Sequence, residues 1–122
     1  MSQLKVYHYA QCGTCRKAVK WLEARGHELE LHPIKEEPPG VEELRAAVQA
    51  SGLPLKKFFN TSGEVYKQLG LKDKLASMSE QEQLELLSSN GMLIKRPVVI
   101  GEGRATAGFK EEEYQTVWGR EV

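Results

Sequence analysis

The chain has 122 residues, with 17 Lys and Arg against 17 Asp and Glu, and its formal net charge is +0. A chain of this length is expected to form one domain around a single hydrophobic core. The balanced charge gives no electrostatic reason to bind nucleic acid directly or to bind an anionic membrane, and no apolar run is long enough to span a bilayer.

The first third of the chain has the pattern of strand, helix and strand. Residues 4–9 are rich in β-forming side chains and predict the first strand. Residues 16–25 have apolar side chains at helical spacing, and Gly26 follows them as a typical C-terminal stop. Residues 28–32 alternate with a period of two and predict the second strand. Such a βαβ unit is expected to place its strands parallel.

The middle of the chain predicts helices. Gly52 and Gly70 each follow an apolar periodic segment and are expected to end a helix. Ser79-Glu-Gln-Glu82 matches a capping box, which predicts the start of a further helix.

After residue 91 the spacing of the apolar residues changes from a helical pattern to a strand pattern. Residues 97–100 and 105–107 predict two strands of a hairpin, joined by a four-residue connection over 101–104. Residues 110–118 predict a closing helix. The order βαβ, helices, ββα predicts an α/β fold with one mixed sheet and an all-helical insertion.

Cys12 and Cys15 are the two cysteines of the chain, and they lie between the first predicted strand and the first predicted helix. At a helix start, unpaired backbone N–H groups and the helix dipole favour a thiolate. A Cys-x-x-Cys in this context indicates thiol redox chemistry. Zinc binding is the alternative, but His8, His27 and His32 lack the spacing of zinc ligands and are expected to be strand and surface residues.

No N-terminal segment has the pattern of a secretory signal, so we expect a cytoplasmic protein without a structural disulfide framework. In a βαβ–ββα arrangement, the end of the first strand and the start of the third can lie side by side. That would bring Arg96 and Pro97 close to Cys12. Lys95, beside them, is expected to be solvated.

Three ordered blocks, residues 12–17, 92–98 and 108–112, resemble the arsenate reductase (ArsC)/Spx family of thioredoxin-like proteins. Residues 58–63 are similar to part of that family's helical insertion. The resemblance covers nearly the whole chain and is strongest to the small arsenate reductase-like or Spx/MgsR-like members. It implies a single domain over residues 1–122, with a thioredoxin-like core at about 1–35 and 92–122 and a helical insertion at about 38–91.

The resemblance also implies roles for individual residues. Cys12 is expected to be the attacking thiolate, its pKa lowered by the helix N-terminus and by Arg16. Cys15 is expected to resolve a mixed disulfide or sulfenic acid on Cys12; if it only packs inward, glutathione must do so. Arg96 is expected to bind an oxyanion or a glutathione carboxylate. Pro97, after a cis peptide bond, is expected to shape the substrate groove, with Arg16 as a second substrate-binding residue.

The chain departs from the arsenate reductases at two positions. Where the resemblance leads us to expect arginines, the aligned stretches have Asn60 and Phe109. Of three arginines that would hold an anion, Arg96 alone remains. A single guanidinium is expected to hold an arsenate dianion weakly.

Three functions are compatible with these observations. The first is a monomeric thiol-disulfide oxidoreductase without a bound cofactor, reduced by glutathione with glutaredoxin or by thioredoxin. The second is an Spx-like redox sensor that binds RNA polymerase, although the chain ends soon after Trp118 and such regulators tend to carry a longer charged C-terminal segment. The third is a true arsenate reductase.

Overall fold

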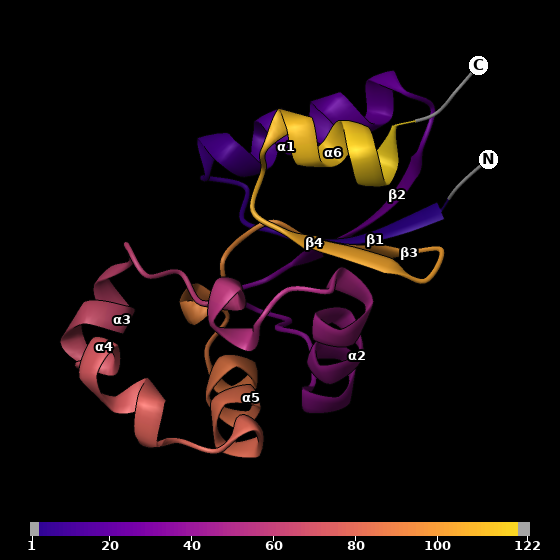
Figure 1. Ribbon diagram of the computed structural model, residues 1–122. Coiled ribbons are helices and arrows are strands. Elements are labelled where there is room, and N and C mark those ends of the chain that lie inside the picture. The colour runs from indigo at the N-terminus through magenta and orange to yellow at the C-terminus, as the bar shows by residue number, and fades with distance from the viewer. Residues whose placement is uncertain (1–2, 120–122) are drawn as a thin grey trace.

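The computed structural model describes residues 3–119 and is shown in Figure 1. Four strands form one sheet in the order β2-β1-β3-β4. They are β1 (Gln3–His8), β2 (Glu28–Pro33), β3 (Val98–Gly101) and β4 (Arg104–Ala107). β1 is parallel to β2 and antiparallel to β3, and β3 is antiparallel to β4. The predicted mixed sheet is therefore confirmed.

Helices cover both faces of this sheet (Figure 1). α1 (Gly13–Ala24) and α6 (Glu111–Trp118) lie together over one face. The chain between β2 and β3 lies on the other side and is built from helices and short 3₁₀ helices (η): α2 (Val41–Ser51), η1 (Leu55–Phe58), α3 (Glu64–Gln68), α4 (Leu71–Lys74), η2 (Leu75–Ser77), α5 (Glu80–Ser89) and η3 (Gly91–Leu93). None of the helices in residues 3–119 is long and apolar enough to cross a membrane.

Alternate residues of β1 pack into different layers, because successive side chains of a strand point to opposite faces. Leu4 and Val6 are buried in a cluster with residues of α1 and α6. Tyr7 is buried in the second cluster, with residues of the helical layer such as Leu84. The sheet is thus the central layer between two hydrophobic cores.

Most predicted helix boundaries are confirmed, but α1 begins earlier than expected. It starts at Gly13 because Cys12 has an extended backbone, with φ −91° and ψ 120°, and acts as the N-cap. Gly52 ends α2 in the left-handed conformation, with φ 70°. The capping box is present at the start of α5, where Ser79 and Glu82 each accept a hydrogen bond from the other's backbone N–H.

The predicted four-residue hairpin connection is wrong. Arg104 pairs with Gly101 in the β3–β4 register, so the turn contains only Glu102 and Gly103. Both turn residues have positive φ, 54° and 74°, which is typical of the tight turn that matches strand twist. Arg104 is the first residue of β4, and its exposed side chain donates to the Val117 carbonyl.

His27 was predicted to be a strand or surface residue, and this is also wrong. Its side chain is buried, and Nε2 lies 2.7 Å from the Trp118 carbonyl oxygen. Since a carbonyl oxygen can only accept, Nε2 carries the proton. His27 therefore ties the turn after α1 to the end of α6.

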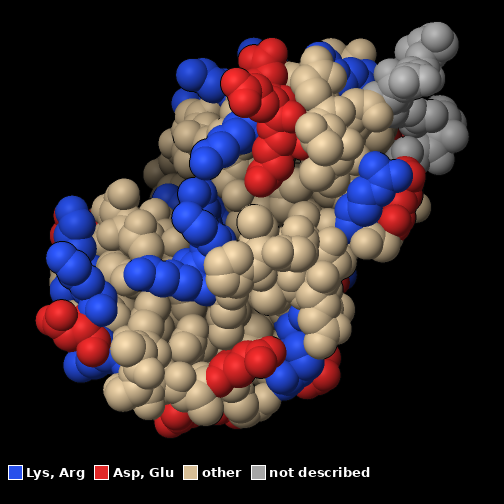
Figure 2. All heavy atoms as spheres, viewed as in Figure 1, with Lys and Arg blue, Asp and Glu red and all other residues tan. Residues whose placement is uncertain are grey.

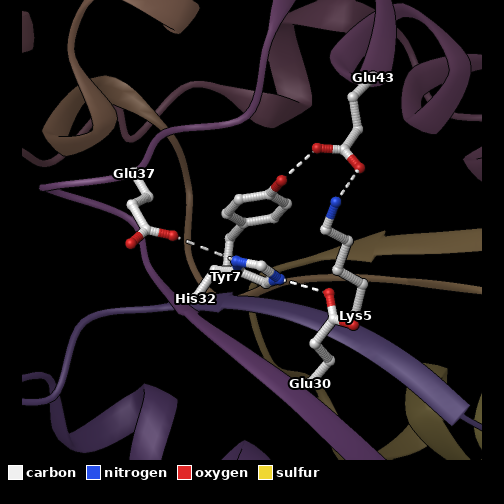
Figure 3. A network of polar contacts seen from close by, with 6 residues as sticks. All are labelled: Lys5, Tyr7, Glu30, His32, Glu37 and Glu43. Atoms are coloured by element: carbon white, nitrogen blue, oxygen red, sulfur yellow. Dashed lines mark hydrogen bonds and ion pairs between the residues drawn. The ribbon is translucent and has the colours of Figure 1, made fainter.

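A polar network joins β1 and β2 to the start of α2 (Figure 3). Glu43 on α2 accepts hydrogen bonds from Tyr7 and from Lys5, whose Nζ lies 2.8 Å away. His32 on β2 stacks on the Tyr7 ring with centroids 5.1 Å apart, and its Nε2 lies 2.6 Å from a Glu30 carboxylate oxygen. Burial and the Glu43 carboxylate raise the pKa of Tyr7 to about 12, so its hydroxyl remains a donor at neutral pH.

Two backbone hydrogen bonds connect the helical layer to the segment that leads into β3. The Asn60 N–H donates to the Leu93 carbonyl at 2.7 Å, and the Lys95 N–H donates to the Phe58 carbonyl at 2.8 Å. This short antiparallel contact holds residues 58–60 beside residues 93–95, next to the cysteine pair described below.

Candidate active site

Cys12 lies where the loop after β1 enters α1. Its backbone N–H donates to the Tyr9 carbonyl at 2.9 Å, and its carbonyl accepts from the Arg16 N–H at 3.1 Å. The side chain is half-buried. As the N-cap residue, Cys12 holds its sulfur next to the unpaired N–H groups of the first helical turn.

Cys15 is one turn further along α1 and is fully buried. The Tyr9 N–H donates to its sulfur at an N···S distance of 3.5 Å. Both cysteines are free thiols. The pair thus combines an accessible sulfur with a protected one.

The two thiols have opposite pKa shifts. Partial burial of Cys12 favours its neutral form. Hydrogen bonds from the Cys15 N–H, the Cys15 thiol and the Thr14 N–H favour the thiolate, and the positive charge of Arg96 does so as well. Together they outweigh burial, so the pKa of Cys12 is lowered. Burial raises the pKa of Cys15 to about 12, and the neighbouring Cys12 sulfur adds to the increase. Cys12 is therefore the thiol that ionises first, and Cys15 stays protonated beside it.

The sequence prediction named Arg16 as a charge that lowers the pKa of Cys12. In the structure, the charge of Arg96 contributes to the lowered pKa, after the hydrogen bonds from Cys15 and Thr14. Arg16 is exposed, and its guanidinium donates to the Ala10 carbonyl at 3.3 Å. It lines a different groove, of about 310 Å³, together with residues of α1 and β2 such as Leu31.

Cys12 opens into a pocket of about 240 Å³ that four separate segments of the chain form together. Its lining residues are Cys12, Thr14, Asn60, Lys95, Arg96, Gly108 and Phe109. The predicted closeness of Arg96 to Cys12 is therefore confirmed. Asn60 and Phe109, the positions where the resemblance predicts arginines, line the same pocket with uncharged side chains.

Arg96 has unused hydrogen-bonding capacity. Its Nε and Nη1 atoms are buried, and neither has a hydrogen-bond partner within the described part of the chain. The guanidinium carbon lies 5.2 Å from the centroid of the Tyr9 ring. The peptide bond from Arg96 to the buried Pro97 is cis, as the resemblance implied. A half-buried cation with free donors in a pocket is suited to binding an anionic group.

Three lining residues were missed from the sequence or interpreted differently. Thr14 lies within the cysteine motif and contributes the N–H named above, and Lys95 is half-buried in the pocket wall rather than freely solvated. Gly108 has φ 84°, and a Cβ built on it would lie 2.7 Å from Cε of Lys95. Glycine at this position therefore leaves room for the Lys95 side chain. For Lys95, the one sequence signal of a place in the pocket was its position next to Arg96 in the chain.

Metal ligation was the alternative use of the cysteines. Within residues 3–119, no group of three or more His, Cys, Asp or Glu side chains is placed to hold a metal ion.

The sequence profile of the ArsC family matches residues 7–117. The chain belongs to the ArsC family. It is 56% identical over 115 residues to the protein YusI of Bacillus subtilis (strain 168), covering 94% of this chain and 98% of YusI. A crystal structure of a putative ArsC family related protein from Bacteroides fragilis has a TM-score of 0.88 and 48% identity, covering 93% of this chain and 96% of that one.

The matching relatives include proteins with two kinds of named function. The global transcriptional regulator Spx of Enterococcus faecalis is 31% identical over 98% of this chain and 89% of its own length. An arsenate reductase of Neisseria meningitidis is 27% identical over 96% of this chain and 99% of its own length. The ArsC family thus includes reductases and regulators, and the predicted family and thioredoxin-like fold are confirmed.

Proposed function

We propose that this chain is a small cytoplasmic thiol-disulfide oxidoreductase of the arsenate reductase-like type, with Cys12 as nucleophile and Cys15 as resolving thiol. One observation carries the proposal. The sulfur of Cys12, with its lowered pKa, opens into the same pocket as Arg96, a half-buried residue whose Nε and Nη1 donors are buried and have no partner among residues 3–119. A thiolate beside an anion-binding group is suited to attack on a disulfide or peroxide carried by an anionic molecule.

In the first step, the Cys12 thiolate attacks one sulfur of a substrate disulfide. The bond from Cys12 to that sulfur forms, the substrate S–S bond breaks, and the second sulfur leaves as a thiolate with the electron pair. Arg96 is placed to stabilise the anionic group of the substrate during the attack, because two of its donors are free.

In the second step, Cys15 loses its proton and attacks the Cys12 sulfur. A Cys12–Cys15 disulfide forms, the bond from Cys12 to the substrate sulfur breaks, and the substrate sulfur leaves with the electron pair and takes up the proton that Cys15 lost. The Cys12 thiolate raises the pKa of Cys15, and that contribution is lost once Cys12 is bound to substrate. Reduction by glutathione with glutaredoxin, or by thioredoxin, then restores both thiols, so the cycle needs no bound cofactor.

Arsenate is the less favoured substrate. Asn60 and Phe109 contribute no charge to the pocket, and Arg96 is the one guanidinium among the lining residues. An arsenate dianion held by one guanidinium binds more weakly than one held by several. We therefore expect slow arsenate-dependent turnover with either donor system.

Intact-mass measurement after mild peroxide treatment tests the proposal. Two thiols and one peroxide give one disulfide and two waters, so the protein should lose two hydrogens and regain them when thioredoxin or glutathione is added. Cys15→Ser should not show this loss and should instead form a Cys12 sulfenic acid or mixed disulfide. An unchanged mass under peroxide would contradict the proposal and favour zinc analysis next.

A redox regulator that binds RNA polymerase is the second candidate, supported by the 31% identity to Spx. The Cys12–Cys15 disulfide would then change the affinity for the polymerase, with the helical layer or α1 as the docking face. A polymerase pull-down with reduced and oxidised protein separates the two functions. Binding that depends on oxidation, and is lost in Cys12→Ser, would favour the regulator.

A further inference from the structure

A second pocket adjoins the cysteine pocket. It has a volume of about 260 Å³, and its lining residues are Lys56, Lys57, Phe59, Thr61 and Lys95. Lys95 also lines the cysteine pocket, so one side chain forms a wall of both. We refer to this second cavity as the lysine pocket.

The two pockets are built on the same pair of segments. Phe59 forms an isolated antiparallel bridge with Ile94. Asn60, the next residue, lines the cysteine pocket, whereas Phe59 and Thr61 line the lysine pocket. The backbone contact that holds residues 58–60 beside 93–95 therefore fixes the lysine pocket relative to Cys12.

The lysine pocket is positively charged without internal compensation. No acidic side chain is among the residues that line either pocket. The ammonium groups of Lys56, Lys57 and Lys95 make no hydrogen bond or ion pair with any other residue that the structure describes. Figure 2 shows basic side chains gathered where the layer of α1 and α6 meets the helical layer.

We propose that the lysine pocket binds the carboxylates of a low-molecular-weight anionic thiol or disulfide whose sulfur reacts with Cys12. This inference rests on the proposed function and assigns the chemical class of its thiol partner. A reactive sulfur in one pocket and uncompensated ammonium groups in the adjoining one fit a molecule with sulfur at one end and carboxylates at the other. Pockets of a few hundred Å³ are of the order that small ligands occupy, which favours a small thiol over a protein surface.

Glutathione disulfide serves as the probe. The Cys12 thiolate attacks one of its sulfurs, the bond from Cys12 to glutathione forms, and the second glutathione leaves as a thiolate with the electron pair. The reaction needs no other oxidant, because the disulfide itself is reduced as Cys12 is oxidised.

The experiment measures the second-order rate of this step in a Cys15→Ser background, where the mixed disulfide accumulates and is counted by intact mass. Bis(2-hydroxyethyl) disulfide, which has no charge, is the reference oxidant. Lys56→Ala/Lys57→Ala should slow the reaction with glutathione disulfide by roughly two- to five-fold for each lysine removed. Its rate with the neutral disulfide should stay the same, and 0.5 M salt should remove the difference between the two proteins.

Lys72→Ala/Lys74→Ala is the matched control, because it removes two exposed lysines of α4 that line neither pocket. An equal slowing in both double variants would overturn the lysine pocket as the binding site, since net charge alone would then explain it. Unchanged glutathione rates in Lys56→Ala/Lys57→Ala would overturn it as well. If Cys12 reacts with the neutral disulfide in all variants, the proposed function stands even if the lysine pocket does not bind carboxylates. If Cys12 reacts with neither disulfide, the proposed function and the proposed role of the lysine pocket are both contradicted.

Discussion

Replacement of Arg96 by Met is expected to stabilise the protein while it impairs the site. Arg96 keeps Nε and Nη1 buried, with no hydrogen-bond partner for either among residues 3–119. Methionine retains an apolar stem of similar reach and has no donors to bury. We therefore expect Arg96→Met to be more stable than the parent protein and to react more slowly with anionic disulfides.

The size of the effect follows from two opposing contributions. Each unpaired buried donor costs about 1–3 kcal/mol, and two are removed. The contact of the guanidinium carbon with the Tyr9 ring at 5.2 Å is lost, which costs about 0.5–2 kcal/mol. The donors dominate, so the free energy of unfolding should rise by about 1 kcal/mol or more.

Urea denaturation of the reduced protein measures this difference. The parent protein and the Arg96→Met variant should both carry Cys12→Ser. The attraction between Arg96 and the Cys12 thiolate is then absent from both and does not contribute to the difference in free energy of unfolding. Arg25→Met is the matched control: its guanidinium carbon lies 3.5 Å from the Trp21 ring centroid, and its Nη1 donates to the Trp21 carbonyl at 3.4 Å. That variant loses paired contacts and should be destabilised by about 1 kcal/mol.

A fall in stability for Arg96→Met, of the size seen for Arg25→Met, would refute the reasoning. It would mean that the donors of Arg96 are satisfied in the folded protein. The description of Arg96 as an open anion-binding group would then be wrong.

Three further predictions concern the thiols, the polar network and the core. Iodoacetamide should modify Cys12 at pH values below the ordinary pKa of a thiol but leave Cys15 unmodified at neutral pH, because its pKa is about 12; peptide mass mapping that finds both labelled would contradict this. Burial disfavours the charged form of the Glu43 carboxylate, but the hydrogen bonds from Lys5 and Tyr7 outweigh this and lower the pKa of Glu43. The charged carboxylate therefore stabilises the fold at pH values above the unfolded-state pKa of Glu43. This stabilisation is lost as the pH falls through the lower pKa of the folded state. Glu43→Gln should lower the free energy of unfolding by roughly 0.5–1 kcal/mol at pH 7, and urea titrations should show the difference shrinking below pH 4.5; a constant difference would count against the pair. Leu84→Ala should lower the free energy of unfolding by about 2–5 kcal/mol, because Leu84 is fully buried; a loss under about 1 kcal/mol would show a loosely packed helical layer.

The sequence predicted the parts of the fold that depend on local chemistry. The Ser79 capping box and the left-handed Gly52 are present where expected, because each is determined by a few adjacent residues. The two-residue turn of the β3–β4 hairpin was not predicted. It depends on the pairing of Arg104 with Gly101 across the hairpin, which no single segment encodes.

The candidate site was predictable only in part. Cys12 and Cys15 were visible as a motif, and the closeness of Arg96 followed from the order of strands. The lysine pocket was not visible, because Lys57 and Lys95 lie far apart in sequence and meet through the contact between residues 58–60 and 93–95.

The central claim is that Cys12 and Cys15 form one two-electron couple. The most direct measurement equilibrates the protein in a series of buffers with graded ratios of glutathione to glutathione disulfide, quenches with acid, alkylates the free thiols and records intact masses. The account predicts that the wild-type protein passes from two alkylated thiols to none in a single transition. Cys15→Ser should instead accumulate a glutathione adduct on Cys12. If the wild-type protein also stops at that adduct with Cys15 alkylated, Cys15 is not the resolving thiol and the central claim is contradicted.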